Sequence, residues 1–213
     1  MTSWKELSMF RSILALLFVL LAFSAKAATL YYESATTGGD LHLGVLVGSD
    51  QFIGVRFNVD TPTTVSAIGG TFVSLMPQQI FGAVVRLNSY SDFPDSTDLS
   101  TLDVLAGVTF STDSTFSDRV VEIPPQDLEP GVYGVIFGSG LFGTVGTSYM
   151  PVASDNIGQP SYFWLDSQQN WRNGDLSPSR LTVYSESSVV PEPSSLLLMC
   201  GSGLLLFRRR RRS

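Results

Sequence analysis

Between its two ends the chain alternates hydrophobic and polar residues with a period of two, which is the pattern of β-strands. Two segments alternate most clearly, residues 52–59 and residues 80–87. Their apolar positions are Ile53, Val55, Phe57 and Val59 in the first segment and Phe81, Ala83, Val85 and Leu87 in the second. We expect these two apolar faces to be buried together, with the alternate positions Gly54, Arg56 and Asn58 on the opposite side.

The same pattern, bounded by Gly, Pro, Asn and Asp, predicts roughly nine short strands. Residues 132–137 form an almost unbroken apolar run after the turn Leu128-Glu129-Pro130-Gly131, which predicts a central strand buried on both faces. No ten-residue stretch shows helical periodicity with caps. The fold class is therefore predicted as all-β, an antiparallel β-sandwich. The expected strands are 29–33, 52–59, 63–72, 80–87, 104–110, 119–123 (ending at Pro124-Pro125), 132–137, 162–165 and 181–184.

The N-terminal end has the pattern of a signal peptide rather than of a strand. Lys5 and Arg11 precede an apolar core at residues 13–23, and small residues follow at Ala25 and Ala27. We expect residues 1–27 to be removed by cleavage after Ala27. A membrane anchor at this end is the less favoured alternative, because the apolar core is short.

The C-terminal end has three parts in a fixed order. Pro191, Glu192 and Pro193 come first, an apolar run over residues 196–207 follows, and a cluster of arginines comes last. As a helix, twelve residues span only about 18 Å, short of the roughly 30 Å of a bilayer core. Arginines stay on the cytoplasmic side of a membrane, so this end is predicted to face inward. The cluster is Arg208, Arg209, Arg210, Arg211 and Arg212.

This order resembles the PEP-CTERM sorting signal of Gram-negative bacteria. The resemblance implies export, recognition by the membrane protease-transpeptidase exosortase, removal of the tail, and delivery to the cell surface or an extracellular polysaccharide matrix such as that of a biofilm. An ordinary C-terminal membrane anchor is the alternative. The domains expected are a signal peptide (1–27), a β-sandwich (28–184), a linker (185–190) and the sorting signal (191–213), with a transmembrane segment at 194–207.

A second resemblance concerns the β-rich part. The Gln51-Phe52 step, the Leu-x-Pro-Gly-x-Tyr step from Leu128 to Tyr133, and a late Trp-containing segment look like the jelly-roll domains found upstream of such tails. The resemblance implies a jelly-roll-like sandwich.

Charge and cysteine content narrow the function classes. Residues 28–193 hold 18 of the 19 acids but only five arginines and no lysine, so 5 − 18 gives about −13. Such a charge argues against nucleic acid and anionic membrane surfaces as partners. The single cysteine, Cys200, lies in the tail, so no disulfide can stabilise the domain. The tail implies only transient contact with the inner membrane.

Four acids crowd a predicted loop, and they suggest two alternatives. Carboxylates and loop carbonyls can coordinate Ca²⁺, whereas a solvated turn with Asx caps is the more common use of such residues. No other cofactor is expected, because one histidine and no domain cysteine leave too few ligands for zinc. The acids are Asp92, Asp95, Asp98 and Asp103.

Aromatic residues concentrate late in the domain. Tyr162, Trp164 and Trp171 lie among amides and carboxylates, which is the chemistry of a sugar-binding face. Filling the core is the alternative role for these rings. His42, with Asp40 nearby and the glycine-flanked Ser139, is weak support for a hydrolase. We therefore expect a non-enzymatic surface or matrix protein, structural or adhesive, with a carbohydrate-binding module that associates with exopolysaccharide as the alternative.

Overall fold

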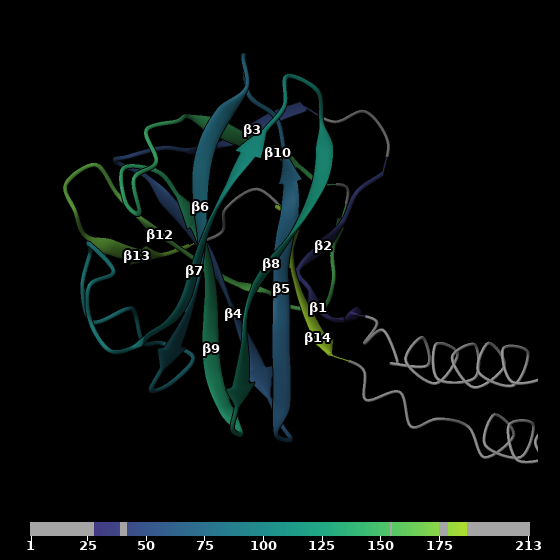
Figure 1. The fold of residues 1–213 in the computed structure, drawn as a ribbon, viewed down its shortest axis with the longest axis vertical. Helices are drawn as coiled ribbons and strands as arrows, with labels where there is room; N and C mark the ends of the chain where they lie inside the picture. The colour runs from purple at the N-terminus through teal and green to yellow at the C-terminus, as the bar shows by residue number, and fades with distance from the viewer. Residues whose placement is uncertain (1–27, 39–41, 154, 175–178, 187–213) are drawn as a thin grey trace, which may run out of the picture. The chain divides into compact units, whose positions relative to one another are not determined.

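The computed structural model describes residues 28–38, 42–153, 155–174 and 179–186. In these residues every regular element is a strand, all strand pairs are antiparallel, and residues 28–186 form one compact unit (Figure 1). The strands are β1 (Ala28–Glu33), β2 (Ala35–Thr36), β3 (His42–Val47), β4 (Phe52–Val59), β5 (Thr63–Phe72), β6 (Gln78–Leu87), β7 (Val104–Thr112), β8 (Ser117–Leu128), β9 (Gly131–Gly138), β10 (Ser148–Val152), β11 (Asp155–Asn156), β12 (Ser161–Leu165), β13 (Trp171–Asn173) and β14 (Leu181–Glu186). The predicted all-β class is confirmed.

The smaller main sheet joins the two ends of the domain. Its strand order is β1-β14-β5-β8, so the last strand lies between the first strand and β5. Ala28 is paired with Glu186, which places the start of the domain beside its end. The chain therefore enters and leaves the domain at one place.

The larger sheet has the order β13-β12-β4-β9-β6-β7, with β9 inside it. Residues 133–138 of β9 are all buried, and the prediction of a central strand covered on both faces is confirmed. Tyr133 fixes the turn into β9, because its hydroxyl donates a hydrogen bond to the carbonyl oxygen of Glu129 at 2.8 Å. The Leu-x-Pro-Gly-x-Tyr step is thus a turn that this hydrogen bond stabilises, and it leads directly into the central strand.

The two main sheets share a core. Val55 and Val135 of the larger sheet belong to the same buried cluster as Ile68, Phe72 and Val183 of the smaller one. Edge-to-face contacts between aromatic rings, such as Phe72 with Phe137 at 5.0 Å between ring centroids, stabilise the packing of the two sheets. The antiparallel sandwich follows from this packing of one sheet face on another.

A second apolar cluster covers the other face of the larger sheet. On that face Gly54 of β4, Ile136 of β9 and Ala83 of β6 lie side by side in neighbouring strands. Phe93 and Leu99, from the connection between β6 and β7, pack over this face. The expectation that the faces of residues 52–59 and 80–87 are buried together is wrong, although both are buried. Ile53, Val55, Phe57 and Val59 line the core between the sheets, whereas Phe81, Ala83, Val85 and Leu87 belong to the second cluster.

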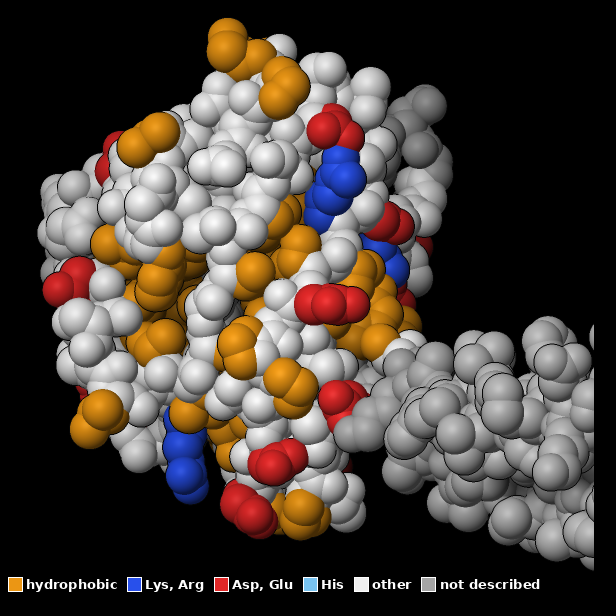
Figure 2. Space-filling view, in the orientation of Figure 1, with side chains coloured by type: hydrophobic (Ala, Val, Ile, Leu, Met, Phe, Trp, Pro, Cys, Tyr) orange, Lys and Arg blue, Asp and Glu red, His pale blue; other side chains and the backbone are white. Residues whose placement is uncertain are grey.

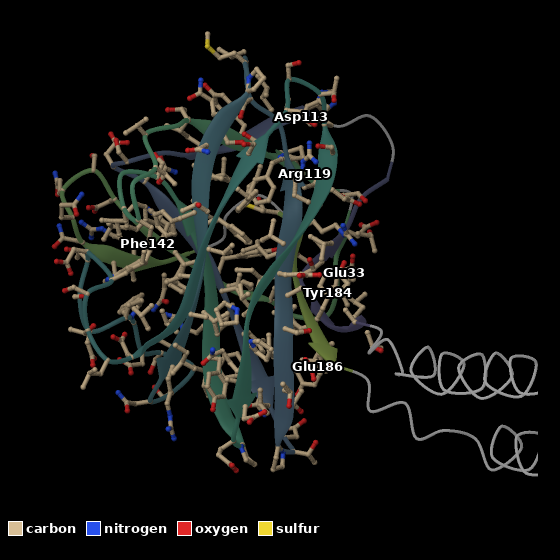
Figure 3. All side chains as sticks on the ribbon, viewed as in Figure 1. Glu33, Asp113, Arg119, Phe142, Tyr184 and Glu186 are labelled. Carbon is tan, nitrogen blue, oxygen red and sulfur yellow. The ribbon has the colours of Figure 1, made fainter. Side chains whose placement is uncertain are left out.

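Small residues make room for this second cluster. A Cβ added at Gly54 would lie 2.5 Å from the Phe163 ring, so the ring rests directly on backbone. The ring of Phe142, half exposed at 46%, closes the margin of the cluster over Gly107, 5.2 Å from the Phe81 ring (Figure 3). Gly54 and Arg56 lie on the side opposite Ile53 and Val55, as predicted, and because the second cluster covers this side both are buried.

Strand β8 departs from the sequence prediction at its end. It continues through Pro124 and Pro125 to Leu128, where the prediction ended it at Ile123. The register with β5 shifts between Val65 and Ala67, and β8 is at the end of the sheet order. A bulge on an edge strand accommodates prolines because their missing N–H groups are not needed for the ladder.

Candidate functional site

The sorting-signal residues Pro191, Glu192 and Pro193, the arginines 208–212, and the signal cleavage positions Ala25 and Ala27 lie outside the described residues. The predicted transmembrane segment 194–207 lies outside them as well. Within the described ranges, no helix has the length and apolar character needed to cross a bilayer.

The three rings predicted to bind sugar do not share one face. Tyr162 is only 4% exposed, and its hydroxyl donates to Ser179 O at 2.9 Å or to Asn156 Oδ1 at 3.0 Å. Trp164 packs against the same inter-sheet core. Trp171 pairs with Leu165 and packs on the second cluster, 5.5 Å from the Phe163 ring. The structure therefore uses these rings mainly as packing groups, and burial raises the pKa of Tyr162.

Three of the four loop acids, Asp92, Asp98 and Asp103, act as local caps. Asp92 accepts hydrogen bonds from the backbone and side-chain nitrogens of Asn88, both at 2.8 Å, and the backbone bond is the main reason that its pKa is lowered. Asp98 accepts from the Ser100 hydroxyl at 2.6 Å, and Asp103 accepts from the Asp95 amide at 2.9 Å. Among the described residues, no three Asp, Glu, His or Cys side chains are grouped so that they could hold a metal ion.

Of the three hydrolase candidates the structure describes His42 and Ser139, and they differ in exposure. His42 begins β3 and is exposed, whereas Ser139 is fully buried. The Ser139 hydroxyl has no hydrogen-bond partner within the described part of the chain. Asp40 lies outside that part.

Arg56 is a buried cation on the side of β4 opposite Ile53, Val55 and Phe57. Its exposed fraction is 1%, and its Nε and Nη2 groups donate to the carbonyl oxygen of Asp92 at 3.0 and 2.6 Å. Nη1 donates to Ser161 Oγ at 3.1 Å, and the guanidinium lies over the rings of Phe163 and Phe93, at 4.5 and 5.0 Å. Loss of hydration lowers the pKa of Arg56, which the charge of Asp92 partly opposes. Arg56 thus attaches the β6–β7 connection to the larger sheet.

A small groove lies at the end of the β5–β6 connection. It has a volume of about 140 Å³ and is lined by Leu75, Met76, Gln78, Thr147 and Tyr149. Leu75 and Met76 are 81% and 61% exposed, and Figure 2 shows hydrophobic side chains standing out at the top of the molecule, where this connection lies. The groove could not be predicted from the sequence pattern, because residues 148–152 were not expected to form a strand.

Residues 189–212 match a family model described as the PEP-CTERM protein-sorting motif. The tail is a PEP-CTERM sorting motif. It indicates an exported protein that is targeted to exosortase, as the resemblance implied. The match includes Pro191, Glu192, Pro193 and the five arginines, and it begins three residues after β14 ends at Glu186.

Two further comparisons add little to the PEP-CTERM match. A solved structure described as the exo-β-1,3-galactanase Pc1,3Gal43A from Phanerochaete chrysosporium with galactose is 13% identical, with a TM-score of 0.30. The likeness covers 59% of this chain and 30% of that chain, so the match spans less than a third of that enzyme chain. No curated protein matches the sequence.

Proposed function

We propose that this protein is a non-enzymatic component of the cell surface or extracellular matrix, structural or adhesive, which exosortase processes after export. The observation that carries the proposal is the order of parts. A PEP-CTERM motif at residues 189–212 directly follows a compact β-domain whose last strand ends at Glu186. The N-terminal signal peptide supplies the export step, and the arginines halt translocation.

The nested strand pairing supports a jelly-roll domain as the exported cargo. The first long strand pairs with the last (β1 with β14), and inside this pair β4 pairs with β9, β5 with β8 and β6 with β7. A long hairpin rolled into two sheets gives this nesting, which is the plan of a jelly roll. Strands β2, β3 and β10–β13 are additions to it.

Charge supports a role outside the cell rather than on nucleic acid. The domain and linker carry about −13, and the few arginines are mostly engaged within the fold. Arg180 bonds Glu33 and lies 2.9 Å from Asp118, while Arg119 pairs with Asp113 (Figure 3 labels Glu33, Asp113 and Arg119). The remaining negative surface favours solubility.

The test follows the tail in two hosts, one with exosortase and one without. We expect the mature chain from the exosortase host to lack Cys200 and the arginines by mass spectrometry, and the chain from the other host to keep them. Glu192→Ala should leave membrane insertion intact and block cutting. Replacing residues 208–212 by serine should impair insertion.

Glu122→Ala is the matched control, because Glu122 is an exposed acid on β8, outside the motif. It should be processed like the parent. A mature chain that keeps Cys200 and all five arginines in the exosortase host would show a permanent anchor and refute the proposal.

A further inference from the structure

The groove beside the β5–β6 connection is held on a rigid frame. Val73 and Tyr149 exchange two backbone hydrogen bonds, at 2.9 and 2.8 Å, and the Ser148 hydroxyl donates to Val73 O at 3.0 Å. The amide of Gly146 donates to Gln79 O at 3.0 Å. Two segments distant in sequence are therefore fastened together, so a ligand would meet a preformed surface and would lose little affinity to ordering it.

The lining residues suit an uncharged ligand with hydroxyl groups. Tyr149 contributes a half-buried ring, while Gln78 and Thr147 contribute an amide and a hydroxyl. Within the described part of the chain these three side chains make no hydrogen bond to protein, so they are available to a ligand. A ring that stacks against C–H groups, beside groups that bond hydroxyls, is suited to one face of a sugar.

Charge and size narrow the ligand further. None of the five lining residues is charged, and the domain's charge of about −13 opposes polyanions. A volume of about 140 Å³ is below the roughly 300–1,000 Å³ of sites that enclose a drug-sized ligand, so it holds about one sugar ring. We propose that this groove is a subsite for single residues of a neutral polysaccharide.

The position of the groove fits a polymer outside the cell. Ser185 pairs with Val65, whereas the groove begins ten residues farther along the chain at Leu75 (β5 in Figure 1). Strand β5 ends at Phe72, seven residues after Val65, so at about 3.3 Å per residue the groove lies roughly 20 Å or more along the sheet from the Glu186 end, where the tail joins. That the groove meets a polymer outside the cell rests on the proposed function, whereas the inference that the groove binds a neutral sugar does not.

One subsite of this size binds its ligand weakly, and many such subsites acting together on one polymer raise the apparent affinity. A single sugar contact corresponds to a Kd of about 1 mM or weaker, near the low end of specific affinities. Many copies on one surface, facing a polymer with many identical units, act together and raise the apparent affinity by about a hundredfold or more. A polymer of identical units therefore suits a groove that holds one unit.

The test uses the full chain in detergent and gels that contain a soluble neutral polysaccharide: dextran, laminarin or a galactan. We expect at least one of them to retard the protein, whereas alginate, a polyanion, does not. Tyr149→Phe and Gln78→Ala each remove one hydrogen-bonding group and should weaken retardation by about fivefold. Tyr149→Ala removes the ring and should abolish it.

Two matched controls separate the groove from general surface effects. Tyr90 is 47% exposed and Leu102 is 99% exposed, both in the β6–β7 connection. Tyr90→Ala and Leu102→Ser should be retarded like the parent, and thermal unfolding followed by circular dichroism shows whether each variant is folded. Tyr149→Phe keeps the ring and the packing, so it tests the groove even if Tyr149→Ala does not fold.

Three results would overturn the proposal. These are retardation by none of the neutral polysaccharides, equal retardation of parent and Gln78→Ala, or a dimer in sedimentation that Leu75→Ser abolishes, which would make the groove a contact between copies. Tail processing is measured separately, so loss of sugar binding with normal removal of Cys200 refutes this inference alone.

Discussion

Replacing Arg56 by alanine should destabilise the domain more than replacing any exposed arginine does. Arg56 is 1% exposed. Two of its hydrogen bonds, both to Asp92 O, and its contact with the Phe93 ring hold the β6–β7 connection to the sheet, while Ser161 and Phe163 of β12 contact Arg56 from within the sheet. Alanine leaves the carbonyl of Asp92 without its two donors and opens a void between Phe93 and Phe163.

The magnitude follows from these contacts. An unpaired buried carbonyl costs about 1–3 kcal/mol, and the two cation–π contacts are worth about 0.5–2 kcal/mol each. The void adds a further cost. Removing the buried guanidinium also removes the free-energy cost of dehydrating it, which offsets part of the loss. We expect a net loss of about 3–5 kcal/mol, which lowers Tm by roughly 10 °C in a domain of this size. Arg56→Met keeps the length of the chain between the rings and should lose only about 1–3 kcal/mol, chiefly from the carbonyl.

The assay is thermal unfolding of the full chain in detergent, followed by circular dichroism. Arg86→Ala is the matched control, since Arg86 is exposed on β6, and it should change stability by less than about 0.5 kcal/mol. A Tm for Arg56→Ala within about 2 °C of the Arg86→Ala value would refute the reasoning.

Three other substitutions or pairs of substitutions test the fold. Val135→Asp should prevent folding, because Val135 is fully buried in β9 and an unpaired buried charge costs several kcal/mol; soluble, cooperatively melting protein would contradict this. Gly54→Ala should cost about 1–3 kcal/mol, since its Cβ would lie 2.5 Å from the Phe163 ring, whereas Gly48→Ala, whose Cβ meets nothing closer than 3.4 Å, should differ little in Tm from the parent. Tyr133→Phe should cost about 1 kcal/mol by losing the bond to Glu129, whereas Tyr32→Phe should cost nothing at neutral pH, because the buried Tyr32 hydroxyl has no partner within the described residues. Burial raises the pKa of Tyr32, so above pH about 10 the unfolded chain loses this proton first and stability falls; denaturant titrations should show a smaller fall for Tyr32→Phe.

The sequence predicted the ladder of long strands well, because alternation reports which residues are extended. Strands β4 and β5 have the bounds expected from the pattern, and β9 is the central strand that its apolar run indicated. Alternation does not report what covers the second face of a sheet. It therefore placed Arg56 on the side opposite the core between the sheets but could not show that a connection distant in sequence buries it.

The short strands and the candidate sites were harder to predict for a related reason. Strands β3 and β10 pair with each other, so each depends on a partner about a hundred residues away rather than on its own pattern. Trp164 and Trp171 are close in sequence, yet they pack on opposite faces of one sheet. The groove combines residues 75–78 with residues 147–149, and no local motif links these two segments.

The place of β14 between β1 and β5 sets the order of events during export. A chain that crosses a membrane from its N-terminus delivers β14 last, and until then β1 has no neighbour in its sheet and one edge of β5 is unpaired. When Glu186 emerges, the sorting motif at residues 189–212 follows directly. The strand that completes this sheet and the sorting motif are therefore neighbours in the chain. A chain truncated before β14 would lack both the strand that pairs with β1 and β5 and the sorting motif at residues 189–212.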